Sequence, residues 1–240
     1  KGKTKAGPHG DFIFEMDHIV GELMKTLEQH GFAKNTLIIF SSDNGPEVPT
    51  TIAMRRDYEH DGARPWRGVK RDNWEGGHRV PFIARWPGKI LPGSTATQTI
   101  CLTDLLATMA AITGFKLPNS AGEDSFNILP ALLGSKKSVR EYTLHQTISL
   151  ALAIRHGDWK YLDHRGSGGN NYDRGGEWGM KQFALPEKVP TASGQLYNLK
   201  TDPGETTNLY LKEPNRAETL KAKLEEFKRT GRSTPKINRP

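Results

Sequence analysis

A short apolar run that ends at a carboxylate and an amide constrains this chain most. Residues 36–48 read TLIIFSSDNGPEV, so Leu37–Phe40 lead directly to Asp43 and Asn44. A continuously apolar strand is typical of a parallel sheet that helices cover on both faces, and ligands bind outside the carboxyl ends of such strands. Asp43 and Asn44 offer hard oxygen ligands suited to Ca²⁺ or Mg²⁺, and a simple Asx turn is the alternative interpretation.

The patterns on either side of this run predict an α/β arrangement. Residues 11–30 repeat apolar side chains on one helical face, and Gly31 follows as a stop signal. A second apolar strand is predicted at Val80–Trp86 and a second amphipathic helix at residues 98–113. Residues 46–79 show no sustained period, and we interpret them as a long irregular loop of the kind that carries function.

The second half of the chain has a different sequence pattern, with shorter apolar runs. Four short strand-like pieces, EYTLHQ, LALAIRHG, WKYLDH and GQLYNL, predict a small antiparallel sheet. The glycine-rich residues 166–179 lack the spacing of a phosphate-binding loop and predict a mobile loop, and a last helix is predicted at about residues 214–229. We therefore expect residues 1–135 to form part of an α/β domain and residues 136–240 a small α+β subdomain with a basic tail.

Charge and composition limit the classes of partner that this chain is expected to bind. The 240 residues carry a net charge of +7, which favours anionic partners. Zinc-finger spacings and aromatic RNA-binding motifs do not occur in the sequence, so we predict no nucleic-acid partner. No run approaches the roughly 20 apolar residues of a membrane span. The single cysteine, Cys101, excludes an internal disulfide.

Several cations precede the second apolar strand. The segment RPWRGVKRDNWEGGHRVPFIARWPG includes Arg67 and Lys70. A loop that leaves one strand at a pair of oxygen ligands and enters the next past several cations is suited to binding an anion against a metal. Each cation taken alone is equally compatible with a solvated surface charge.

These two segments resemble the sulfatase family, the arylsulfatase-like hydrolases of the alkaline phosphatase superfamily. Four later stretches resemble family landmarks in the same order: LTDLLATMAAITG, DSFNILPALLG, AIRHGDWKYL and QLYNLKTDPGETTNL. The resemblance extends from about Gly7 to Pro214. It implies part of an alkaline-phosphatase-like α/β sandwich with a smaller C-terminal antiparallel sheet and helix, and it implies a sulfuric ester hydrolase in the full-length protein.

The resemblance also implies roles for individual residues. Asp43 and Asn44 match a pair that binds a divalent metal, usually Ca²⁺. Lys70 matches a lysine that contacts the sulfate oxygens and serves catalysis. The family's nucleophile is a formylglycine made from a C/S-x-P-x-R motif, which these 240 residues do not contain. We therefore predict that the nucleophile and the remaining metal ligands belong to a missing N-terminal portion and that this chain alone is inactive. Its uncovered apolar face should lead to a partner fragment, an oligomer or limited solubility.

Three further residues are candidates for substrate binding. They are His60 in the long loop, Arg67 beside Lys70, and His145 at the end of a strand-like run. An exposed loop histidine, a pairing of Arg67 with Glu59 or Asp61, and a packed strand histidine are the alternative interpretations.

The substrate is expected to be a sulfated small molecule or carbohydrate. A phosphodiester or phosphonate hydrolase of the same superfamily and a non-catalytic polyanion-binding module are the alternative functions. Family members are often periplasmic, extracellular or lysosomal, and the compartment of this protein stays unassigned.

Overall fold

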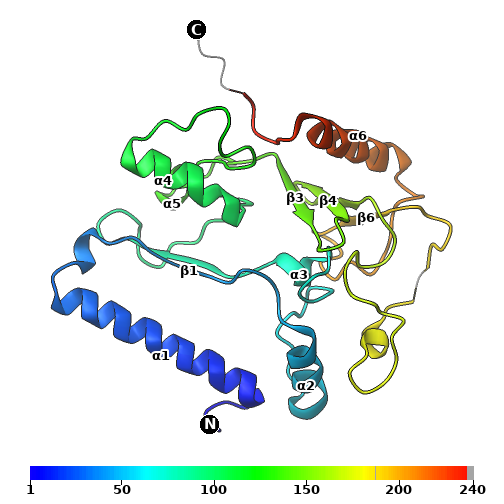
Figure 1. The fold of residues 1–240 in the computed structure, drawn as a ribbon, viewed down its shortest axis with the longest axis horizontal. Coiled ribbons are helices and arrows are strands. Elements are labelled where there is room, and N and C mark those ends of the chain that lie inside the picture. The colour runs from blue at the N-terminus through cyan, green and yellow to red at the C-terminus, as the bar shows by residue number, and fades with distance from the viewer. Residues whose placement is uncertain (187, 237–240) are drawn as a thin grey trace.

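The computed structural model describes residues 1–186 and 188–236 and combines helices with two antiparallel sheets (Figure 1). Residues 237–240 of the basic tail lie outside the described residues. The α-helices and strands, in order, are α1 (Gly7–Gln29), β1 (Ile38–Ser41), α2 (Val48–Tyr58), α3 (Glu75–His78), β2 (Phe82–Arg85), α4 (Leu105–Thr113), α5 (Leu129–Leu132), β3 (Tyr142–Gln146), β4 (Leu152–His156), β5 (Trp159–Leu162), β6 (Gln195–Asn198) and α6 (Pro214–Thr230).

The two apolar strands of the first half form an antiparallel ribbon. β1 pairs with β2 so that Ile38 lies opposite Arg85 and Ser41 opposite Phe82. The prediction of a parallel sheet is wrong for this pair. An uninterrupted apolar run indicates that both faces of a strand are suited to burial, but it says nothing about the direction of the neighbouring strand. All four β1 residues are only half-buried, so this part of the chain leaves the ribbon partly uncovered.

Residues 46–79 are less irregular than their sequence indicates. They contain α2 and the short helix α3. The side chain of Glu47 accepts a hydrogen bond from the Val48 amide at 2.9 Å, and Pro49 lies in the first turn of α2. Only Thr51, Ile52 and Met54 of α2 are buried, and this narrow contact explains why the apolar pattern of the helix is weak.

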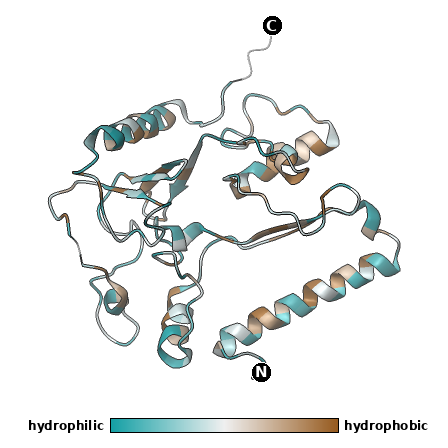
Figure 2. Cartoon of the chain, turned by 180° about the vertical axis from the view of Figure 1, so that it is seen from behind, coloured by the Kyte–Doolittle hydropathy of each residue, from teal (hydrophilic) through white to brown (hydrophobic). Residues whose placement is uncertain are grey.

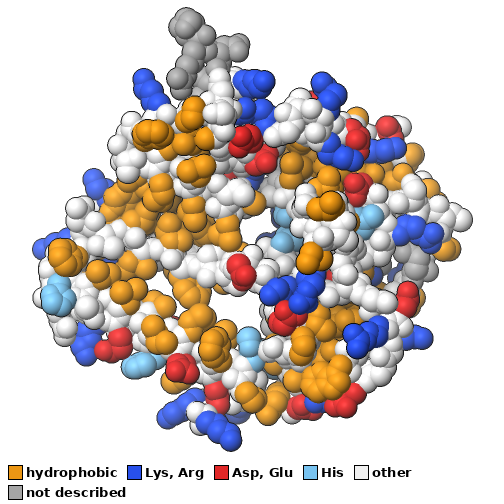
Figure 3. Space-filling view, in the orientation of Figure 1, with side chains coloured by type: hydrophobic (Ala, Val, Ile, Leu, Met, Phe, Trp, Pro, Cys, Tyr) orange, Lys and Arg blue, Asp and Glu red, His pale blue; other side chains and the backbone are white. Residues whose placement is uncertain are grey.

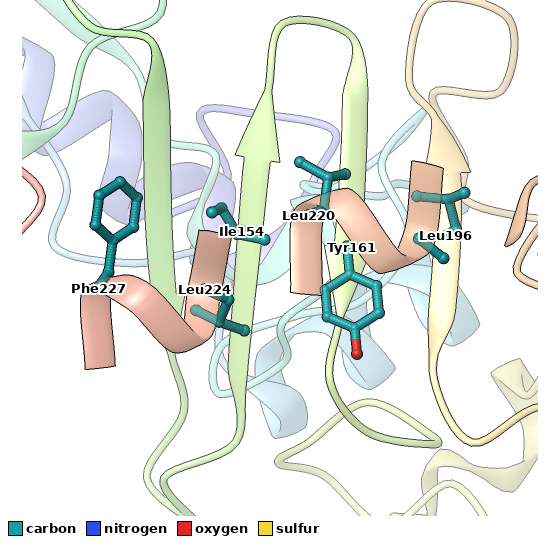
Figure 4. Packing of buried hydrophobic residues seen from close by; sticks show 7 residues of the cluster. Ile154, Tyr161, Leu196, Leu220, Leu224 and Phe227 are labelled. Carbon is teal, nitrogen blue, oxygen red and sulfur yellow. The ribbon is translucent and has the colours of Figure 1, made fainter. Parts of the chain in front are cut away.

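The second sheet follows the prediction closely. Its order is β3-β4-β5-β6, with every neighbouring pair antiparallel. The helix α6 covers one face. Figure 4 shows Leu220 and Leu224 of α6 pointing toward Ile154, Tyr161 and Leu196 of the strands, and together these residues form a buried cluster. The spacing of four residues in α6 places both leucines on the face that contacts the sheet.

The opposite face of this sheet receives the segment that leads into α3. Trp74 packs there against Ala153, Leu162 and Tyr197 in a second buried cluster. The helix α3 therefore lies between the β1–β2 ribbon and the four-stranded sheet (Figure 1). Residues from both halves of the chain meet at this point. The predicted boundary near residue 135 falls between α5 and β3, and the division into two domains stays a prediction.

The long helix α1 is the least covered element. It contacts α2 near one end, and much of its apolar surface faces outward. Phe12 is 64% exposed, Ile19 60% and Leu23 52%. Brown bands recur along α1 in Figure 2, and Figure 3 shows apolar side chains gathered over the half of the molecule that holds α1 and the ribbon. None of the described helices is both long and apolar enough to cross a membrane.

Candidate active site

The predicted metal ligands lie in a bend immediately after β1. Asp43 is exposed, and Asn44 is half-buried with its Nδ2 donating to the Gly45 carbonyl at 2.9 Å. The Gly45 amide donates to the carbonyl of Gly77 in α3 at 2.9 Å. A Cβ at Gly45 would lie 1.8 Å from the carbonyl oxygen of Gly76, so only glycine fits this approach. The bend is thereby fixed against α3.

Lys70 lies beside the same bend. Its amide donates to the carbonyl of Pro46 at 2.9 Å, and its Nζ lies 3.3 Å from Oε2 of Glu47. Arg71 donates to both carboxylate oxygens of Glu47, at 2.6 and 3.0 Å. The segments that carry Asp43, Asn44 and Lys70 are therefore joined through Pro46 and Glu47.

The charge of Glu47 is well stabilised. The hydrogen bond from Arg71 is the largest cause of a pKa lowered to about 2, and the Val48 amide and Lys70 act in the same direction. Glu47 is thus ionised at neutral pH and faces the Lys70 ammonium. In this structure, the ammonium of Lys70, which is predicted to bind an anionic group, is therefore paired with the carboxylate of Glu47 in the same chain.

A buried cluster of charged side chains lies next to α3. Lys160 of β5 is fully buried, and its Nζ lies 3.0 Å from Oε1 of Glu75 and 3.1 Å from Oε1 of Glu205. The contact with Glu205 is an ion pair without the alignment of a hydrogen bond. Glu205 also accepts a hydrogen bond from the Glu75 amide at 2.6 Å. The loop after β6 and the first turn of α3 are therefore tied together through Lys160.

The pKa values of the two buried carboxyls, Glu75 and Glu205, are shifted in opposite directions. Burial would raise the pKa of Glu75, but the positive charge of Lys160, supported by Arg155, holds that pKa well below its usual value. Burial raises the pKa of Glu205 to about 7, because Lys160 offsets its desolvation only in part. Glu75 is the ionised partner of Lys160, and Glu205 takes up a proton more readily.

His145, a predicted substrate residue, belongs to this buried cluster. Its ring stacks on that of His78 with centroids 3.7 Å apart. Burial lowers the pKa of His78 to about 3 and keeps the pKa of His145 well below its usual value. Nε2 of His145 has no hydrogen-bond partner among the described residues. Both rings are neutral at pH 7, and a substrate role for His145 stays a prediction.

Glu75, His78 and His145 have the composition of a metal site, since one ligand atom from each lies within 4.8 Å of the others. Lys160 argues against that use, because its Nζ lies 3.0 Å from Nε2 of His78 as well as from Glu75. A metal ion would lie beside that ammonium. The two stacked rings are only 20° from parallel, so their in-plane nitrogen lone pairs do not converge on one ion. We assign no metal to this trio.

The remaining predicted residues are placed differently. His60 is exposed just after α2, and its backbone amide donates to the Met54 carbonyl at 3.1 Å. The guanidinium of Arg67 lies 3.5 Å from the ring centroid of Trp74 and donates to the Glu205 carbonyl at 2.9 Å. The alternative interpretation, a pairing of Arg67 with Glu59 or Asp61, is not among the contacts of Arg67 in the described residues, and its substrate role stays a prediction.

Comparison with known proteins identifies the family. A family model described as Sulfatase matches residues 5–115. A curated N-acetylgalactosamine-6-O-sulfatase of Bacteroides thetaiotaomicron is 34% identical over 230 residues, which cover 95% of this chain and 43% of the relative. The chain belongs to the sulfatase family. Arylsulfatase A of Homo sapiens is 35% identical over 213 residues, covering 86% of this sulfatase chain and 40% of the relative.

A solved structure agrees with this membership. A protein described under the metabolism of multiple glycosaminoglycans by Bacteroides thetaiotaomicron superposes with a TM-score of 0.79 at 32% identity, covering 95% of the sulfatase chain and 46% of the other. The fold is therefore the α/β fold of the alkaline phosphatase-like superfamily, as predicted. The sulfatase chain spans less than half the length of these relatives.

Sequence reasoning missed the buried charge cluster of Glu75, Lys160 and Glu205 that lies beside the candidate site. Glu75, Lys160 and Glu205 were not candidates, although each is at most 1% exposed. The signal in the sequence is a lysine inside the strand Trp159–Leu162, where every neighbour is apolar or aromatic. A buried lysine needs a carboxylate partner, but the partners lie 85 and 45 positions away.

Proposed function

We propose that the sulfatase chain supplies the metal-binding and sulfate-binding part of a sulfuric ester hydrolase in its full-length protein. The observation that carries the proposal is the hydrogen bond from the Lys70 amide to the Pro46 carbonyl, which holds the Lys70 turn against the Asp43–Asn44 bend. A fixed ammonium stabilises negative charge on the sulfuryl oxygens without rearranging during the reaction. Lys70 binds the sulfuryl group in this proposal.

The oxygen atoms at the bend are of the type that Ca²⁺ prefers as ligands. Asp43 offers a carboxylate, and Asn44 offers Oδ1 because its Nδ2 is already used in a hydrogen bond to Gly45. Mg²⁺ accepts the same atoms, but Ca²⁺ takes about 6–8 oxygens at a flexible site. We propose that other ligands come from the N-terminal portion of the full-length protein. A bound Ca²⁺ supplies positive charge that polarises the sulfuryl group.

No residue of this chain is proposed as the nucleophile, because the C/S-x-P-x-R motif is not among its 240 residues. We propose that a formylglycine in the N-terminal portion has that role. Turnover of an aryl sulfate by the 240-residue chain alone would contradict this division of the site.

The uncovered apolar surface supports the same proposal. The exposed side chains of Phe12, Ile19 and Leu23 on α1, together with the half-buried β1, present a surface that water solvates poorly. The relatives have more than twice the length of this chain. We propose that an N-terminal portion of the full-length protein supplies this additional length and packs against this surface.

The names of two relatives support a substrate class. They are an N-acetylgalactosamine-6-O-sulfatase and an arylsulfatase, so we propose a carbohydrate or aryl sulfate ester. The net charge of +7 agrees with a polyanionic sulfated glycan. The relatives favour neither the phosphodiester alternative nor the non-catalytic one.

The test uses the full-length protein with 4-nitrophenyl sulfate, N-acetylgalactosamine 6-sulfate and an aryl phosphodiester. We expect preference for the sulfates. Lys70→Ala should lower kcat/KM by roughly 100- to 1000-fold, the loss typical of one group that stabilises transition-state charge. Lys89→Ala, at an exposed turn lysine, is the matched control. Equal activity of the two variants would overturn the assignment of Lys70.

A further inference from the structure

The turn that presents Lys70 has little internal support. Residues 68–72 contain two positive φ angles, 87° at Gly68 and 82° at Arg71. Arg71 is not a glycine, so its left-handed conformation needs contacts from outside the turn. The Asp72 amide donates to the Val69 carbonyl at 3.0 Å, and the Lys70 amide reaches Pro46. These bonds alone leave the C-terminal side of the turn unattached.

Asp72 supplies the missing attachment. Its side chain is almost completely buried, with 3% of its surface exposed. Oδ2 accepts hydrogen bonds from the Val69 amide at 2.9 Å and from the Tyr172 hydroxyl at 2.6 Å. Oδ1 accepts from Nδ2 and the amide of Asn170, at 2.8 and 3.2 Å. One carboxylate thus joins both ends of the turn to a loop about 100 positions further along the chain.

The partner of Asp72 is the first half of the glycine-rich loop, which the sequence predicts to be mobile. The structure instead anchors residues 167–172 to the turn. Nδ2 of Asn170 also donates to the Lys70 carbonyl at 2.8 Å, and the Asn73 amide donates to the Ser167 carbonyl at 2.8 Å. A Cβ at Gly169 would lie only 1.9 Å from the Arg71 carbonyl oxygen. Direct backbone contact therefore requires glycine at this position.

Tyr172 fixes the loop in turn. Its ring meets Trp74 edge-on with centroids 5.1 Å apart, and it packs against the cluster of Ile52 and Val69. Burial raises the pKa of the Tyr172 hydroxyl, which therefore keeps its proton and donates to Asp72 at neutral pH. The loop is held by the hydrophobic core on one side and grips the turn with polar groups on the other.

We propose that Asp72 is a positioning residue for Lys70 and that residues 167–172 of the glycine-rich loop clamp the sulfate-binding turn through it. The inference rests on the proposed function, since it concerns the cation assigned to the sulfuryl group. Asp72 itself does not touch the substrate. It fixes the position of the Lys70 backbone, and the backbone position determines where the ammonium group lies.

Kinetics of the full-length protein on 4-nitrophenyl sulfate test the coupling. Asp72→Asn keeps the volume but replaces one carboxylate oxygen, which accepts two of the four hydrogen bonds, by a donor. We expect kcat/KM to fall roughly 10- to 100-fold, as for a displaced positioning group. In the Lys70→Ala background the same change should cost less than about 2-fold, because residues that act together are not additive. Equal losses in both backgrounds would overturn the proposal and leave Asp72 a general stabiliser.

Hydrogen exchange gives a readout that is independent of turnover. A peptide covering residues 67–74 should exchange about 10-fold faster or more in Asp72→Asn, and also faster in Tyr172→Phe. Asp173→Asn is the matched control, since this exposed aspartate makes the same charge change in the same loop. Exchange of this peptide at the wild-type rate in Asp72→Asn would overturn the proposal. A wild-type protein that turns over no sulfate ester refutes the proposed function, whereas the exchange comparison still decides whether Asp72 holds the turn.

Discussion

Lys160 places its Nζ atom 3.0 Å from Oε1 of Glu75, between the four-stranded sheet and α3. Neither side chain has contact with bulk water, since Lys160 is 0% exposed and Glu75 1%. Their attraction connects an element of the C-terminal sheet to the helix on which the Asp43–Asn44 bend rests. The stability of the site and that of the C-terminal sheet are therefore coupled.

Lys160→Met should destabilise the full-length protein by about 3–5 kcal/mol, because it leaves the buried Glu75 without its nearest cation. The midpoint of urea unfolding measures this change. Lys221→Met is the control, because Lys221 on α6 has only an exposed partner, Glu218, at 4.0 Å and should change stability by about 0.5 kcal/mol or less. Equal midpoints for both variants would show that the buried pair contributes nothing.

The raised pKa of Glu205, about 7, predicts a pH dependence of stability. The folded protein binds this proton more tightly than the unfolded chain, so the contribution is complete below about pH 4.5 and is lost as the pH rises through 7. The melting temperature of the wild type should therefore fall, relative to Glu205→Gln, between pH 5 and pH 8.5. Glu75 titrates below this window. Parallel melting curves for the two proteins would contradict the shift.

Glu47→Gln should strengthen inhibition by inorganic sulfate. Glu47 pairs with Lys70 at 3.3 Å and competes with the anion for the ammonium. Since the pair is partly exposed, we expect a decrease in the inhibition constant of about 1.5- to 5-fold, fading at high salt. Asp57→Asn, which removes an exposed partner of Arg56 on α2, is the control. A weaker inhibition in Glu47→Gln would mean that Glu47 orients Lys70 rather than competing for it.

Ile19→Asp should destabilise the full-length protein by about 2–4 kcal/mol, because we expect the exposed face of α1 to be buried by the N-terminal portion. Thermal unfolding measures the effect. His18→Asp changes the preceding residue, which is exposed and lies about 100° around α1 from Ile19, outside the apolar stripe, and should be nearly neutral. If both substitutions are equally tolerated, the apolar face is open in the complete protein.

The sequence predicted the elements that depend on local pattern. The sheet β3–β6 and α6 follow from alternation and from the spacing of Leu220 and Leu224, which are local properties. The antiparallel pairing of β1 with β2 was not predictable in this way, because strand direction depends on the connection between strands. The helix α2 escaped notice because only three of its residues are buried.

The site shows the same division. Asp43, Asn44 and Lys70 stand in recognisable motifs, and the structure brings their segments together at Pro46. Their roles stay predictions. Asp72 belongs to no recognisable motif, and its proposed positioning role depends on hydrogen bonds from Asn170 and Tyr172, about 100 positions away in the chain. Contacts at that separation are decided by the tertiary fold, which a single sequence does not display.

The close approach of Gly169 to Arg71 has a practical consequence for protein engineering. Exchanging the whole glycine-rich loop with that of a relative would also shift the turn that presents Lys70, because the backbones of the loop and the turn are in direct contact. Residues 173–179 lie beyond the Asp72 clamp. A loop graft should therefore begin after Tyr172 and keep residues 167–172 unchanged.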